Sequence, residues 1–257
     1  MTFFLRDGDA LVPTEMAHGP WAPDMLHGRL LGGLMAEAIE RGHSLEGLRP
    51  SRLTVDLFRN ARLAPLKVTT DRIRDGRRIR VVDAAVTGPD GLIARASLVL
   101  LKHGGHPPGE VWPAERWNVP QPEDCGPPTR RSGGSVPTFD LWRIGAGDDW
   151  DLPHRRRAWL RETHPLIGDE PLSPLVRLAL AADLASPTAH WSTTGLNYIN
   201  ADYTITLGRL PEGEYIGIEA GGHISADGIA AGSCTLHDRT GPVAFATTTA
   251  LANRKPG

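Results

Sequence analysis

Apolar residues in the first half of the chain recur at helical spacing in one segment and at strand spacing in several others. Between residues 30 and 39 their spacing of i, i+4 and i+8 is typical of an amphipathic helix, and Gly42 supplies its stop. Strand-like runs follow at 52–58, 66–70, 78–86 and 92–101, with the turn sequence Gly-Pro-Asp-Gly at 88–91. The pattern predicts one helix followed by antiparallel strands.

The second half of the chain repeats this order. Ser173 and Pro174 are suited to be the N-cap and first residue of a helix that is predicted to run to about Ala185 and to end at Ser186-Pro187. The strand-like runs that follow are 202–207, 214–218, 228–236 and 243–251, with a last turn at 238–241. Two earlier runs, 139–144 and 155–162, are predicted to open this second unit and to match a shorter lead-in of the first.

The two halves align with a constant offset. Arg59 to Gly91 and Arg209 to Gly241 both span 32 residues, so each second-half position is its first-half counterpart plus 150. A helix followed by antiparallel strands that wrap it, occurring twice, predicts an α+β fold of two hot-dog units side by side, a double hot-dog. The predicted units are residues 1–103 and 138–257.

A Pro- and Gly-rich stretch, residues 104–137, separates the two predicted units and cannot form one regular element. We interpret it as a connector. Trp112 and Trp117 predict that it packs onto the surface of a unit, because large aromatic residues are uncommon in flexible linkers.

One carboxylate breaks the internal repeat. The offset of 150 places Asp183, inside the apolar run LALAADLASP, on Gly33 of the first helix. Burial of an unpaired carboxylate is costly or raises its pKa, so Asp183 is expected to have a partner or a task. Two other interpretations stay open: a solvated strip near the helix end, or hydrogen bonds with the turn at Ser186-Pro187.

The composition and motifs of the chain argue against several classes of protein. The formal net charge is -2, from 28 basic and 30 acidic residues in 257, which gives no general basic surface for nucleic acid or anionic membrane. Cys125 and Cys234 lie far apart without metal-ligand spacing, so neither a disulfide framework nor a metal site is indicated. The chain has no long apolar segment and no GxSxG, phosphate-loop or HExxH motif. We expect a cytoplasmic protein without a membrane span.

Several segments together resemble a known family. They are HGPW (18–21), LHGRLLGGLMAEAIE (26–40), RPSRLTVDLFRNA (49–61), DGRRIRVVDAAV (75–86), SPLVRLALAAD (173–183), NADYTITLGRLPEGEYIGIEA (200–220) and DGIAAGSCTLHDRTGPVA (227–244). In order and spacing the chain resembles the thioesterase-like superfamily of double hot-dog proteins, related to the bacterial acyl-CoA thioesterase II group. The resemblance covers nearly the whole chain except the connector.

The resemblance implies a catalytic site. In that family an Asp on the second helix, a Thr early in the following strand and a Gln on the last strand hold the water that attacks an acyl-CoA thioester. Asp183 matches the Asp, whereas Asn200 stands at the Thr position and Thr248 at the Gln position, or Thr249 if the register slips by one. Our hypothesis is that Asn200 and Thr248 exchange the amide and hydroxyl roles.

The start of the first helix is the candidate substrate-binding region. Backbone N–H groups near His27 and Gly28 would bind the thioester oxygen. Gly33, beside Gly32, would allow close approach of an acyl chain, although tight helix packing explains the two glycines equally well. His27 is itself favoured as a structural helix-start residue over a catalytic one.

Two function classes remain. The first is an acyl-CoA thioesterase that uses Asp183 and needs no cofactor; the second is a non-catalytic protein that binds acyl-CoA or another acylated ligand. Asp183 favours the enzyme, and the altered Asn200 and Thr248 favour the binder. Exposed sheet edges predict a homo-oligomer. Acyl-chain length, and CoA or acyl carrier protein as the carrier, are left open.

Overall fold

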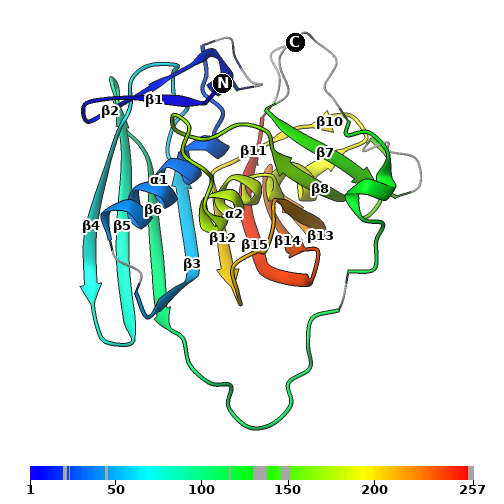
Figure 1. Cartoon of the computed structure of the whole chain (residues 1–257). Coiled ribbons are helices and arrows are strands. Elements are labelled where there is room, and N and C mark those ends of the chain that lie inside the picture. Colours follow the sequence, from blue (N-terminus) through cyan, green and yellow to red (C-terminus); the bar gives the residue numbers. More distant parts are fainter. Residues whose placement is uncertain are drawn as a thin grey trace.

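A computed structural model describes residues 1–19, 22, 24–43, 46–115, 117–129, 138–145 and 151–253. Pro20 and Trp21 of the HGPW run, and the last part of the predicted connector, lie outside the described residues. In the described part of the chain, eleven strands join one long antiparallel sheet, and the main helices of the two halves lie side by side against it (Figure 1).

The first half forms one helix and four consecutive strands of this sheet. The helix is α1 (Arg29–Gly42), and the strands are β3 (Leu48–Leu57), β4 (Lys67–Asp75), β5 (Ile79–Gly88) and β6 (Gly91–Lys102). Leu30, Leu34 and Ile39 are fully buried on the face of α1 that packs on the sheet, which confirms the predicted helical spacing. The predicted turn joins β5 to β6.

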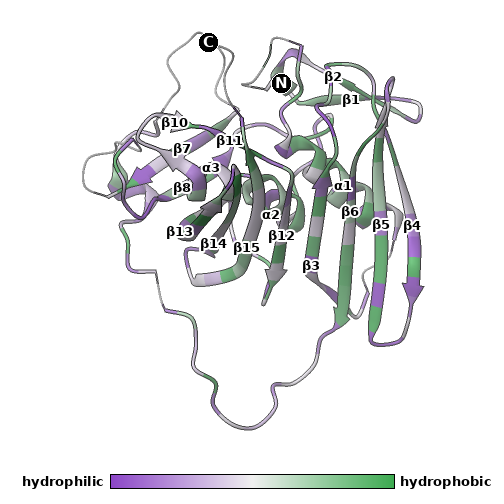
Figure 2. Ribbon diagram, turned by 180° about the vertical axis from the view of Figure 1, so that it is seen from behind, coloured by the Kyte–Doolittle hydropathy of each residue, from purple (hydrophilic) through white to green (hydrophobic). Residues whose placement is uncertain are grey.

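The second half repeats these strands. They are β12 (Asp202–Leu207), β13 (Tyr215–Ala226), β14 (Ile229–Asp238) and β15 (Gly241–Ala252), and the short β11 (Tyr198–Asn200) also pairs with β15. A separate small ladder joins β9 (Trp191–Ser192) to β10 (Gly195–Leu196). Viewed from behind, the strands lie in front of the mainly hydrophobic helices (Figure 2). This is the predicted double hot-dog fold.

An approximate two-fold axis relates the halves. Strands β5 and β14 differ by 150 at both ends, as do β6 and β15. Strands β3 and β12 pair antiparallel at the centre, where Thr54 and Thr204 are direct partners and their hydroxyl oxygens lie 3.0 Å apart. These two residues are equivalent under the offset, so the axis passes between them and the sheet continues from one unit into the other.

The main helices therefore run antiparallel. Near the end of α1, Glu40 accepts a hydrogen bond from Ser173, the N-cap of the second-half helix α2 (Pro174–Ala182). Nearer the start of α1, Gly33 packs against Leu180, close to the end of α2. Because the helices run in opposite directions, the N-terminal end of α1 lies beside the C-terminal end of α2.

The second-half helix is interrupted. It stops at Ala182 and resumes as α3 (Ala185–His190), so the prediction that Ser186-Pro187 ends the helix was wrong. Pro187 lies inside the first turn of α3, where the missing N–H matters least. The same missing N–H removes the bond that would continue one regular helix through Asp183, which explains the break.

Two strand pairs precede the helices. In the second half β7 (Phe139–Ile144) and β8 (Arg157–Glu162) open the unit as strands, as predicted, and they extend the sheet beyond β13. In the first half β1 (Phe4–Asp7) and β2 (Ala10–Pro13) form a separate two-stranded sheet, while α1 itself begins after a short 3-10 turn. The lead-ins are thus alike in order but differ in whether they join the main sheet.

The described part of the connector first runs away from both units and then returns to the second (Figure 1). Its only described regular element is a 3-10 turn at Pro122–Cys125. Trp117 stacks on His237 with ring centroids 4.6 Å apart and lies over Gly217, which confirms the predicted packing. Trp112 is 88% exposed, so the same prediction for that residue was wrong.

Gly32→Ala is predicted to destabilise the fold by about 1–3 kcal/mol, because a Cβ there overpacks the core. The Cβ would lie 1.8 Å from the Tyr203 hydroxyl oxygen, whereas a Cβ at Gly28 would meet no atom nearer than 4.0 Å. Urea unfolding of both alanine variants measures the difference. Equal stability of Gly32→Ala and the matched control Gly28→Ala would contradict the packing described.

Candidate active site

Asp183 lies at the break between α2 and α3, as the C-cap of α2. The residue is 7% exposed although it follows a helix that is almost wholly apolar. Its Oδ1 accepts a hydrogen bond from Asn200 Nδ2 at 2.8 Å. The two residues that the sequence placed in one site are therefore in direct contact, and the buried carboxylate has the partner it needs.

An irregularity in the sheet aims Asn200 at the helices. Asn200 pairs with Ala250, and Thr204 pairs with Thr247, so four steps along one strand stand opposite three along the other. This extra residue is a β-bulge, which redirects the side chains around it. As a result Asn200 and Tyr203, three residues apart, both reach the helix layer.

Asp202 follows the bulge at Ala201 as the first residue of β12, and it forms hydrogen bonds with the last strand. Its backbone carbonyl accepts a hydrogen bond from Thr248 Oγ1 at 2.8 Å, and its carboxylate accepts the Thr249 backbone N–H at 3.0 Å. Thr248 is buried on the side of the sheet that faces the helices, whereas Thr249 is exposed on the opposite side. The register thus places Thr248 on the same side as Asn200, with its hydroxyl bonded to Asp202.

Burial raises the pKa of Asp183, while the hydrogen bond from Asn200 and the positive charge of Arg29 act in the opposite direction. Arg29 is fully buried at the start of α1 and forms an ion pair with Glu162 at 2.7 Å. The carboxyl of Asp183 is therefore a stronger base than an exposed aspartate, and the positive charge that acts on it comes from the other unit.

The start of α1 is organised by its own side chain and backbone. His27 Nδ1 accepts the Arg29 N–H at 3.4 Å, and the His27 carbonyl accepts the Leu30 N–H at 3.0 Å. The Gly28 carbonyl accepts the Leu31 N–H at 3.0 Å. His27 thus stabilises the helix start, and in the described part of the chain no backbone acceptor is found for the Gly28 N–H.

Gly33 lies where α1 packs against α2. A Cβ there would lie 2.7 Å from Leu180 Cδ2 and 3.3 Å from Leu166 Cδ2. Leucine side chains therefore fill the space beside this glycine, as the tight-packing interpretation expects. Its role toward an acyl chain stays a prediction.

The offset of 150 shows how far the two units have diverged around Asp183. The counterparts of Asp183, Asn200, Tyr203 and Thr248 are, in that order, Gly33, Pro50, Leu53 and Leu98. Every polar group of the site is replaced by glycine or an apolar residue in the first unit. Sequence reasoning applied this comparison to Asp183 alone and so missed Tyr203. Arg29, whose counterpart is Ala179, was missed for the same reason.

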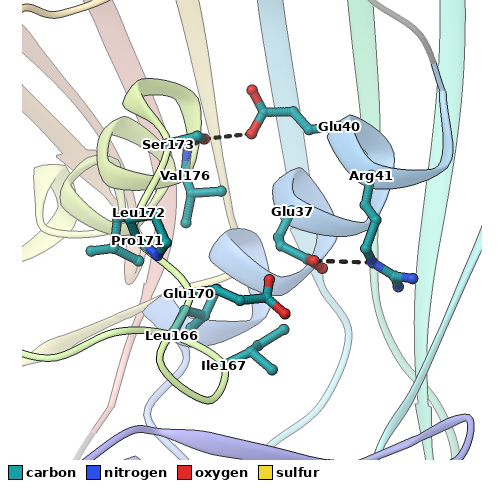
Figure 3. Close-up of a pocket in the computed structure, with 10 residues that line it drawn as sticks. All are labelled: Glu37, Glu40, Arg41, Leu166, Ile167, Glu170, Pro171, Leu172, Ser173 and Val176. Carbon is teal, nitrogen blue, oxygen red and sulfur yellow. Dashed lines mark hydrogen bonds and ion pairs between the residues drawn. The ribbon is translucent and has the colours of Figure 1, made fainter.

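A separate cavity of about 350 Å³ lies at the other end of the helix pair, between the end of α1 and the start of α2 (Figure 3). Its lining includes Glu37, Glu40 and Ser173. Burial raises the pKa of Glu40, and the hydrogen bond from Ser173 opposes that effect. Asp183 lies at the opposite end of α2, so this cavity does not contain the predicted site.

Among the residues that the structure describes, no group of three or more His, Cys, Asp and Glu side chains is arranged to hold a metal ion. Over the same residues, no helix combines the length and the apolar character that crossing a membrane requires.

Comparison with known proteins gives the family. Residues 17–101 match the model of the acyl-CoA thioesterase N-terminal domain, and residues 113–252 match that of the acyl-CoA thioesterase C-terminal domain. The chain belongs to the acyl-CoA thioesterase family. No curated protein sequence matches this chain.

Solved structures share the fold of this thioesterase. The tesB protein of Mycobacterium avium subspecies paratuberculosis is 17% identical with a TM-score of 0.70, over 98% of this chain and 96% of that one. A hot-dog protein from Alicyclobacillus acidocaldarius is 15% identical with a TM-score of 0.70, over 98% and 96%. Acyl-CoA thioesterase II TesB2 from Mycobacterium marinum is 16% identical with a TM-score of 0.64, over 98% and 94%.

Asp183→Asn is predicted to stabilise the thioesterase at neutral pH. Because the folded-state pKa of Asp183 is raised, the protonated carboxyl contributes to the free energy of unfolding. This contribution is lost as the pH rises through that pKa. Asparagine stays neutral and can still accept the Asn200 hydrogen bond, so the gain is about 1.4 kcal/mol per pKa unit of the shift.

Urea unfolding at neutral pH and near pH 4 checks this prediction, with the exposed Asp169→Asn as control. The gain from Asp183→Asn should shrink at the lower pH. A gain that is equal at both pH values, or absent at both, would show that the carboxyl is not destabilised by burial.

Proposed function

We propose that this protein hydrolyses acyl-CoA to a free fatty acid and CoA, with Asp183 as the general base. The observation that carries the proposal is the hydrogen bond from Asn200 to the buried Asp183 beside the N-terminal end of α1. A base with a raised pKa accepts a proton near neutral pH more readily than an exposed aspartate does. The helix end beside it supplies the partial positive charge that a developing oxyanion requires.

The reaction needs only this chain and water. Asn200 holds Oδ1 of Asp183, so we assign Oδ2 to the attacking water. The water oxygen bonds to the thioester carbonyl carbon while Asp183 takes one proton. The tetrahedral intermediate then breaks its C–S bond, and the departing thiolate takes the proton from Asp183. Neither a cofactor nor a metal ion is required for this balance.

We assign the oxyanion to the Gly28 N–H. The neighbouring N–H groups of Arg29, Leu30 and Leu31 donate to acceptors inside the helix start, which leaves Gly28 as the donor best suited to an external oxygen. The absence of a side chain at Gly28 also keeps the approach open. His27 would act by fixing this turn.

The second candidate function is binding of acyl-CoA, or of another acylated ligand, without hydrolysis. It is favoured by Thr248, whose hydroxyl donates to the Asp202 carbonyl and whose position carries the Gln in related enzymes. Our exchange hypothesis gives Asn200 the amide role and leaves Thr248 the hydroxyl role, as a hydrogen-bond acceptor toward water. The cytoplasmic location and homo-oligomeric state expected from the sequence stay predictions.

Asp183→Asn is predicted to lower kcat/KM for acyl-CoA hydrolysis by about 10² to 10⁴, because a positioned base contributes that much. Release of free thiol from acyl-CoA substrates, from short to long chains, measures it, with Asp169→Asn as the control that keeps activity. Saturable acyl-CoA binding by the wild-type protein without turnover on any chain would support the binding function. Unchanged turnover in both Asp183→Asn and Thr248→Val would refute the proposed arrangement.

Asn200→Ala is predicted to shift the acidic limb of the kcat/KM profile to higher pH. The amide lowers the pKa of Asp183, so its loss raises that pKa further, and the ionised base is lost at a higher pH. Thr248→Val should lower the rate without moving this limb, since its hydroxyl bonds Asp202. A limb that stays in place in Asn200→Ala would mean that Asp183 is not the titrating base.

A further inference from the structure

Tyr203 lies in the core between the sheet and the two main helices. Its side chain is fully buried, and its hydroxyl donates to the Ala179 carbonyl on α2 at 2.9 Å. The same hydroxyl lies in a notch on α1 that exists because Gly32 has no side chain. The phenol ring therefore extends from the sheet to both helices and fills the space between them.

This ring lies beside Asp183. Ala179 is one helical turn before Asp183, and its carbonyl would normally accept the Asp183 N–H. That N–H bonds to Ala181 instead, and the Tyr203 hydroxyl takes its place on the Ala179 carbonyl. Burial and the charge of Asp183 both raise the pKa of Tyr203, as expected for a phenol close to a carboxylate.

The surroundings of Asp183 differ in polarity on its two sides. On the side of Asn200, polar groups continue to the surface: Tyr198 packs against His190, whose Nδ1 lies 2.7 Å from Nδ1 of the exposed His223. On the side of Tyr203, the next residue that faces the helices is Ile205, and both are fully buried. A CoA moiety carries phosphates, whose burial would be prohibitive, so only the acyl chain can lie toward Tyr203.

We propose that Tyr203 closes the inner end of the acyl-binding channel and restricts the thioesterase to short acyl chains. This inference rests on the proposed function. A chain whose carbonyl lies at Asp183 meets the phenol ring directly, and the ring is held in place by its hydrogen bond to Ala179. In the first unit the counterpart of Tyr203 is Leu53. Leu53 is also fully buried, but it has no hydroxyl that could be fixed by a hydrogen bond.

Tyr203→Leu is the decisive variant, because leucine fits the equivalent strand position in the first unit. The wild-type protein should hydrolyse acetyl- to butyryl-CoA best. Tyr203→Leu should raise the ratio of kcat/KM for lauroyl-CoA to that for butyryl-CoA by at least about tenfold. Discrimination by a single methylene in a hydrophobic pocket is already of that size. Tyr203→Phe, which keeps the ring, should retain the short-chain preference.

Binding of non-hydrolysable acyl-CoA thioethers, measured by calorimetry, separates this inference from the proposed function. If the protein shows no turnover, but Tyr203→Leu binds long-chain thioethers more tightly than the wild type does, hydrolysis is refuted and the role of Tyr203 in the channel is supported. A folded Tyr203→Leu protein with an unchanged chain-length ratio would overturn the inference. If that variant does not fold, the wild-type profile decides, because a preference for lauroyl- or palmitoyl-CoA would overturn it equally.

Discussion

The pairing of β3 with β12 is the constraint on which the rest of the molecule depends. It joins two similar units edge to edge around the Thr54 and Thr204 pair and so imposes an approximate two-fold axis. A two-fold axis between the units makes their helices antiparallel, and antiparallel helices bring the N-terminal end of α1 to the C-terminal end of α2. A helix N-terminus and a carboxylate from different units thereby meet at one place, which neither unit could provide alone.

Two local irregularities then complete that place. The break before Pro187 ends α2 at Asp183, so the carboxylate stands at a helix terminus rather than inside a regular helix. The bulge between β11 and β12 adds one residue to the chain that pairs with β15, and it turns Asn200 toward the carboxylate. The helix break has no counterpart in α1, whereas the bulge recurs in the first unit, where the register of β3 against β6 shifts between Pro50 and Arg52. The cost of a buried charge at Asp183 is reduced, but not removed, by a hydrogen bond from Asn200 and by Arg29 from the first unit.

The two units share the same order of helix and strands, and they differ in the residues around Asp183. The first unit keeps glycine, proline and leucine where the second carries Asp183, Asn200 and Thr248. The first unit instead provides close packing, through Gly32 and Gly33, and the helix start at Gly28. This division places the buried carboxylate, Asn200 and Thr248 in one unit, and each of their polar groups needs a partner because unpaired burial is costly.

The sequence by itself determined the duplication, the order of helix and strands, and the position of Asp183, because hydrophobic periodicity and a constant offset are properties of the chain alone. Through the family resemblance it also predicted Asn200 beside Asp183, and the two residues are in contact. Only the tertiary structure decided that Pro187 opens a second helix, that Trp112 is exposed while Trp117 packs, and that Tyr203 and Arg29 lie beside the carboxylate. These features depend on contacts between residues far apart in sequence, such as Tyr203 with Gly32, and no local pattern specifies such contacts.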